Sequence, residues 1–274
     1  MDFFWWKEKR FRAVWRVEKG GEYSFLVGTA HFCPYRFEKA LTRLIRGAEI
    51  VAFEGPLDQE TMERVVQYGR QGENSPSLYE ALDPRAVKEI NRQLSVRRSA
   101  DTTTRAGLDI FQSATPDFVE THTRGVRPWL GFFTLWSALL DWNYSMDVEA
   151  FRIAQKLGKD IRFLETTEDQ FVALDGIPFE RIVNYLNHIG HWKAYKEMFL
   201  KAFLSGDLAK FVSMTGEFPT RCESILVTRD PIFFKGIKTL FGQGKTAAFV
   251  GAAHIPGIRE RFLADGYHVT QVEA

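Results

Sequence analysis

The sequence predicts an α/β fold with a central sheet built from two related βαβ halves and large helical insertions between them. The main observation is a near-repeat at the two ends of the chain, VGTAHF at residues 27–32 and VGAAHI at residues 250–255. Each copy follows a short apolar run typical of a buried strand and precedes a helical pattern and another apolar run. Such strand–helix–strand units favour parallel strands, because the crossover helix returns the chain to run in the same direction.

The elements of the first half follow from local patterns. Residues 12–18 (RAVWRVE) and 22–28 (EYSFLVG) are rich in β-forming side chains and are separated by a KGG sequence, which predicts a hairpin. Apolar residues at helical spacing over 37–45 predict a helix. The apolar run 50–53 then predicts a strand that leads directly into Glu54.

The remaining segments contain helical periodicity and almost no alternating pattern, so they are expected to be mainly helical. We expect the whole chain, 1–274, to form one domain of this kind. The helical insertions are expected at about 59–148 and 168–241, further strands at 160–165, 246–250 and 268–272, and a helix at about 257–264.

Composition narrows the possible functions. A net charge of +1 offers no large basic surface for nucleic acid or anionic lipid. Two cysteines, Cys33 and Cys222, are too few for a disulfide framework and suit a reducing compartment. The N-terminus lacks the apolar core of a signal peptide, and the apolar run 129–140 is shorter than the roughly 20 residues that span a bilayer. We therefore expect a soluble, cytoplasmic protein with no membrane span and no nucleic-acid partner.

Four side chains follow predicted strands and are the candidates for chemistry. His31 and His254 each stand three residues after a glycine at the end of a strand, and Glu54 and Glu165 also stand at strand ends. In open parallel sheets, ligands bind at the carboxyl ends of the strands. The four side chains are therefore expected to meet in one crevice.

Two imidazoles and a carboxylate are a suitable shell for Zn²⁺, Mn²⁺ or Fe²⁺, and without a metal they could serve as general acid and base. Each residue also has a structural interpretation. A histidine after a strand is commonly a loop residue satisfied by one hydrogen bond. Glu54 could cap the turn before Pro56, and Glu165 could favour the start of a helix at Thr166.

Several longer motifs surround these residues: FLVGTAHF with His31, IVAFEGP with Glu54, RPW at 127–129, SMDVEAFRIAQKLGKDIRFLETTEDQ at 145–170 and AAFVGAAHIPG with His254. With these motifs, the chain resembles the TraB/PrgY/GumN family, which is related to the Tiki metalloproteases and more distantly to erythromycin-esterase and ChaN-like proteins. Arg229 and Asp147 also match family positions. The resemblance implies a two-half α/β fold and metal-dependent cleavage of peptides.

The sequence thus leads to the hypothesis of a metal-dependent hydrolase, a peptidase, that acts on a peptide or small-molecule substrate. The expected cofactor is a divalent ion (Mn²⁺, Co²⁺ or Zn²⁺) bound by His31, Glu54 and His254, with Glu165 as a second carboxylate. Arg229 is expected to hold an anionic substrate group or the developing oxyanion. Two alternatives stay open: a non-catalytic protein that binds peptide or haem in the same crevice, and a metal-free esterase-type hydrolase.

Overall fold

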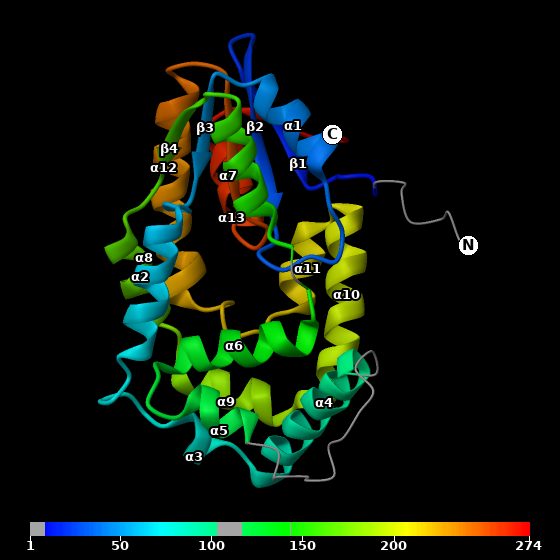
Figure 1. The fold of residues 1–274 in the computed structure, drawn as a ribbon. Coiled ribbons are helices and arrows are strands. Elements are labelled where there is room, and N and C mark those ends of the chain that lie inside the picture. Colours follow the sequence, from blue (N-terminus) through cyan, green and yellow to red (C-terminus); the bar gives the residue numbers. More distant parts are fainter. Residues whose placement is uncertain (1–8, 103–116, 143) are drawn as a thin grey trace, which may run out of the picture.

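A mixed six-stranded sheet forms the upper part of the molecule (Figure 1). The computed structural model describes residues 9–102, 117–142 and 144–274. The strands lie in the order β4-β3-β5-β2-β1-β6. Their bounds are β1 Val14–Lys19, β2 Glu22–Thr29, β3 Ile50–Phe53, β4 Asp160–Phe163, β5 Thr246–Gly251 and β6 His268–Val272. The α/β class expected from the sequence is confirmed.

Strand directions bring the carboxyl ends of β2, β3, β4 and β5 to one edge of the sheet. β1 is antiparallel to β2, so the expected hairpin is confirmed, and Gly20 and Gly21 turn the chain at positive φ. β2, β5, β3 and β4 are mutually parallel, and β5 lies between β2 and β3. Because parallel strands all end on the same side of a sheet, the residues after β2, β3, β4 and β5 lie along this common edge.

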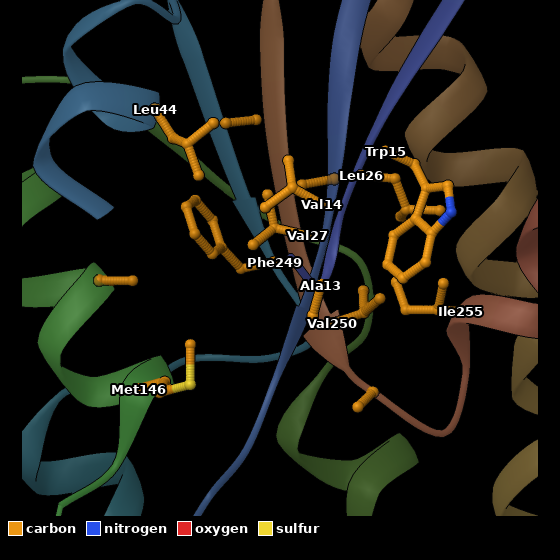
Figure 2. Packing of buried hydrophobic residues seen from close by; sticks show 14 of the residues in the cluster. Ala13, Val14, Trp15, Leu26, Val27, Leu44, Met146, Phe249, Val250 and Ile255 are labelled. Atoms are coloured by element: carbon orange, nitrogen blue, oxygen red, sulfur yellow. The ribbon is translucent and has the colours of Figure 1, made fainter. Parts of the chain in front are cut away.

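Helices cover both faces of the sheet. α1 (Glu38–Arg46) and α7 (Met146–Lys156) pack on one face, whereas α12 (Arg229–Phe241) and α13 (Ile255–Ala264) pack on the other. Figure 2 shows Leu44 of α1 and Met146 of α7 on the side of Phe249, with Trp15 and Ile255 on the opposite side. All five side chains are largely buried, because alternate strand residues point to opposite faces and both faces are covered.

A second group of helices lies beyond the carboxyl edge of the sheet (Figure 1). The described elements of both expected insertions are helical apart from short turns and one isolated bridge. Part of the first insertion, 103–116, lies outside the described residues. These helices are α2 Gln59–Arg70, α3 Leu78–Ala81, α4 Pro84–Thr102, α5 Phe118–Thr123, α6 Pro128–Leu140, α8 Thr167–Asp175, α9 Phe179–Asn187, the 3₁₀ turn η2 Ile189–His191, α10 Trp192–Ser205, α11 Leu208–Met214 and the π-helical turn η3 Glu223–Val227.

The helix α6 is the centre of this helical layer. Its apolar sequence packs in a second hydrophobic cluster, in which Phe132, Leu135 and Leu139 are fully buried. No helix among the described residues has the length and apolar character of a membrane span. The RPW motif ties α6 to α8, because Arg127 pairs with Asp175 at 2.8 Å and Trp129 Nε1 donates to the same carboxylate at 2.9 Å.

Candidate functional site

A cavity of about 190 Å³ lies between the carboxyl edge of the sheet and the helical layer. On the sheet side, its wall includes four of the five residues singled out in the sequence: His31, Glu54, Arg229 and His254. On the helical side, the wall is mainly aromatic. The aromatic residues there are Phe133, Trp136, Trp142, Tyr195, Phe199, Phe211 and Phe218.

His31 pairs with Asp147 at one end of this polar wall. His31 follows β2, and 63% of its side chain is accessible because it faces the cavity. Asp147 lies in the first turn of α7, is buried, and accepts a hydrogen bond from the Thr29 hydroxyl. The Asp147 carboxylate lies 2.9 Å from Nδ1 of His31. Nε2 is therefore the ring nitrogen left for a ligand in the cavity.

The charge of Asp147 controls the protonation of His31. Asp147 is the main reason why the pKa of His31 is raised to about 9; the partial loss of water around the ring within the cavity opposes the rise, and Glu54 adds to it. His31 is consequently an imidazolium at neutral pH in the free protein, and it becomes a base only when the pH approaches 9.

Arg229 joins the two glutamates at the other end of the wall. Its Nε donates to Glu165 at 2.9 Å, and its Nη2 donates to the other oxygen of Glu165 and to Glu54 at 2.8 Å. Glu54 also accepts the backbone N–H of Gly251 at 2.6 Å, so both of its oxygens are engaged. Arg229 stands at the start of α12 and is mostly buried. Because a buried charge without a partner is costly, the stability of this network depends on the ion pairs of Arg229 with the two glutamates.

The network sets the charges of its members. Burial opposes ionisation of Glu54, but Arg229, His254 and His31 outweigh it and lower its pKa to about 2. Burial dominates at Glu165 and raises its pKa, although Arg229 acts in the opposite direction.

The strand β4 ends at Phe163, two residues earlier than expected. Glu165 lies in the turn beyond β4, where its backbone N–H donates to the Glu54 carbonyl at 2.9 Å.

His254 is the more enclosed of the two histidines of the site. It stands directly before α13, which starts at Ile255 rather than near 257, with a proline in its first turn that favours a helix start. Its Nδ1 lies 2.7 Å from an oxygen of Asp230, and its Nε2 lies 3.4 Å from Nη1 of Arg229 and 3.9 Å from Glu54. Only 3% of His254 is exposed.

Sequence reasoning missed two members of the site. Thr29, the last residue of β2, holds Asp147, and Asp230 holds His254. The only signal for Asp230 was its position next to Arg229 in the chain. Asp147 matched a family position, but nothing in the sequence showed that it faces His31.

The residues expected to bind a metal ion meet one requirement of such a site. In metal centres, the second ring nitrogen of a ligating histidine commonly donates to a carboxylate. Nδ1 of His254 is placed to do this with Asp230, and Nδ1 of His31 lies 2.9 Å from Asp147. However, the Arg229 guanidinium lies against both Glu54 and His254. Among the described residues, no three His, Cys, Asp or Glu side chains group as ligands of one ion. One ion shared by His31, Glu54 and His254 does not fit this arrangement unless Arg229 withdraws.

Gly257 makes room for the carboxylate that holds His254. A Cβ added at Gly257 would lie 2.0 Å from an oxygen of Asp230, so Gly257→Ala should push Asp230 away from the imidazole. We expect the substitution to lower the free energy of unfolding by about 1–3 kcal/mol, as overpacking does. Chemical denaturation measures this loss. Gly190→Ala is the control, since a Cβ there meets nothing within 4 Å; equal losses in the two variants would contradict the prediction.

The sequence model of the TraB/PrgY/gumN family matches residues 13–271, which is nearly the whole chain. No curated protein and no solved structure matches the chain significantly.

Proposed function

This chain belongs to the TraB/PrgY/gumN family, and from that premise we propose that it is a hydrolase that cleaves a peptide or another carboxylic acid derivative. The observation that carries the proposal is the His31–Asp147 pair, whose imidazole faces a cavity with both polar and aromatic walls. A histidine held by a buried aspartate is a common arrangement for proton transfer in acyl-group hydrolysis.

In the proposed reaction, His31 acts as the general base. Its neutral imidazole would take a proton from a water molecule, which attacks the substrate carbonyl, and the resulting imidazolium would return that proton to the leaving group. Asp147 would keep Nδ1 protonated and so direct Nε2 toward the water. Arg229 would position Glu54, and its Nη1, which lies 3.4 Å from Nε2 of His254, would stabilise the developing oxyanion.

Metal-dependent hydrolysis by Mn²⁺, Co²⁺ or Zn²⁺ is the second candidate. The observation in its favour is the number of carboxylates at the site: Glu54 and Glu165 contact Arg229, Asp147 pairs with His31, and Asp230 pairs with His254. Among the described residues, these four carboxylates outnumber the two cations of the site, Arg229 and the imidazolium of His31. Such an excess attracts cations. The metal ligands would be His31, Glu54 and His254, as the sequence suggested, with Arg229 displaced.

One screen separates these possibilities. The purified protein would be analysed for bound metal and for haem absorbance, stripped with a chelator, and assayed on peptides, amides and esters with and without each metal. The base mechanism expects hydrolysis by the stripped protein. Turnover only after a metal is added would support the second candidate. No turnover in any combination would sink the hydrolase proposal and favour a non-catalytic binder.

The pH dependence of hydrolysis follows from the raised pKa of His31. Because the base must be neutral, kcat/KM of the stripped protein should rise about tenfold per pH unit and level off near pH 9. In Asp147→Asn, the inflection should move down toward 6.5, the ordinary value for histidine. Steady-state kinetics at constant ionic strength measures both profiles. A rate that falls through pH 9 would show that His31 is the acid instead.

A further inference from the structure

The cavity contains a second arginine, which the proposed proton transfer does not use. Arg221 lies between α11 and η3 and lines the cavity with Thr220 and Ile225. Its Nε donates to the Thr215 hydroxyl at 3.2 Å, and its Nη1 donates to the Thr220 hydroxyl at 3.2 Å. Over the described parts of the chain, no carboxylate forms an ion pair with Arg221. It differs in this respect from Arg229, which forms ion pairs with Glu54 and Glu165.

Within the described ranges, the surroundings of the Arg221 guanidinium are hydroxyls and aromatic rings. The group lies over the rings of Phe211 and Phe218, at 4.8 and 5.7 Å from their centroids. Burial lowers the pKa of Arg221, yet an arginine in a protein keeps its proton. Among the described residues, this partly buried charge is held by two hydroxyls and two rings, and such a charge costs free energy that a bound anion would offset.

The wall of the cavity also carries a lysine and a set of packed aromatic rings. Lys196 also lines it, and its Nζ donates to the Leu140 carbonyl at 3.0 Å. Trp136 packs edge-on against Tyr195 at 5.3 Å between centroids, and Tyr195 stacks on Phe218 at 5.1 Å. Rings packed against one another form a rigid apolar wall that suits a large apolar or aromatic group.

We propose that Arg221 binds the carboxylate of the substrate while the adjacent aromatic wall receives an apolar side chain, so that the substrate is the C-terminal end of a peptide or an N-acylated amino acid. This inference rests on the proposed function, since it names the substrate class of the same cavity. Arginine suits the task because its planar fork matches a carboxylate with two parallel hydrogen bonds. The bond to be cleaved would lie toward His31, at the polar wall.

Binding of two inert probes tests the proposal without turnover. 3-Phenylpropanoate and 3-phenylpropan-1-ol share the aromatic group, but only the first has a carboxylate. Calorimetry should show that the carboxylate binds the wild-type protein at least about tenfold more tightly, as expected for a hydrogen bond to a charged group. Arg221→Gln should reduce this ratio to near one, Arg221→Lys should retain part of it, and the exposed control Arg85→Gln should leave it unchanged.

Each result of these binding measurements decides whether Arg221 binds a carboxylate. Equal affinities of the two probes for the wild-type protein would overturn the proposal, as would a preference that persists in Arg221→Gln. If Arg221→Gln does not fold, the wild-type comparison and Arg221→Lys still decide. Failure of the hydrolase proposal is visible separately: the probes would show the carboxylate preference while no acyl substrate is cleaved. Conversely, equal cleavage of peptides with free and amidated C-termini would refute carboxylate binding and leave the hydrolase intact.

Discussion

His31→Ala should lower kcat/KM by on the order of 10²- to 10⁴-fold, the loss typical of a missing general base. The fold should survive, because the His31 side chain is exposed to the cavity and Asp147 keeps its hydrogen bond from Thr29. Steady-state kinetics on whichever substrate the screen identifies measures the loss. Thermal unfolding of the same samples shows whether the folded fraction is unchanged.

Asp147→Asn tests whether Asp147 positions the imidazole of His31, the group that transfers the proton. Asparagine keeps the shape of aspartate and can still accept the Thr29 hydrogen bond, but it lacks the charge that holds the proton on Nδ1 of His31. We expect a loss of a similar order to that of His31→Ala, because the imidazole would present the wrong tautomer. His268→Ala is the control, since His268 is an exposed histidine on β6. If His31→Ala and Asp147→Asn both kept the wild-type activity that the control is expected to keep, His31 would not be the base.

Arg229→Met should cost about 3–5 kcal/mol of unfolding free energy at pH 7, because it leaves the buried carboxylates of Glu54 and Glu165 without their cation. The unpaired glutamates would take up protons more readily, so the deficit should shrink as the pH is lowered toward 5. Denaturation curves at the two pH values measure both effects.

Two further variants make this stability prediction specific. Arg64→Met removes the same kind of partner from the exposed pair with Glu168 and should cost less than about 1 kcal/mol. The combined variant Glu54→Gln, Glu165→Gln, Arg229→Met removes all three charges and should recover part of the loss. A cost for Arg229→Met no larger than that for Arg64→Met would show that the network contributes little to stability.

Much of the candidate site could be predicted because strand ends are local features of a sequence. A glycine after an apolar run, followed three residues later by histidine, located His31 and His254 without any knowledge of the packing. The parallel direction of β2, β3 and β5 then brings these histidines and Glu54 to one edge. The partners of these residues were not predictable. Asp147 is 118 positions from the threonine that holds it, and only the packing of α7 against the sheet joins them.

By itself, the sequence determined the class of the fold, the order of its strands and helices along the chain, and the residues that follow the parallel strands. Apolar periodicity and turn residues specify these features over a few neighbouring positions. The tertiary structure alone decided which charges meet. It directed Arg229 to two glutamates, placed Asp230 on His254, and brought Arg221 into the wall of the cavity beside Phe211 and Phe218. The physical reason is that each of these contacts depends on how separate helices pack around the edge of the sheet, and local patterns in the chain do not encode that packing.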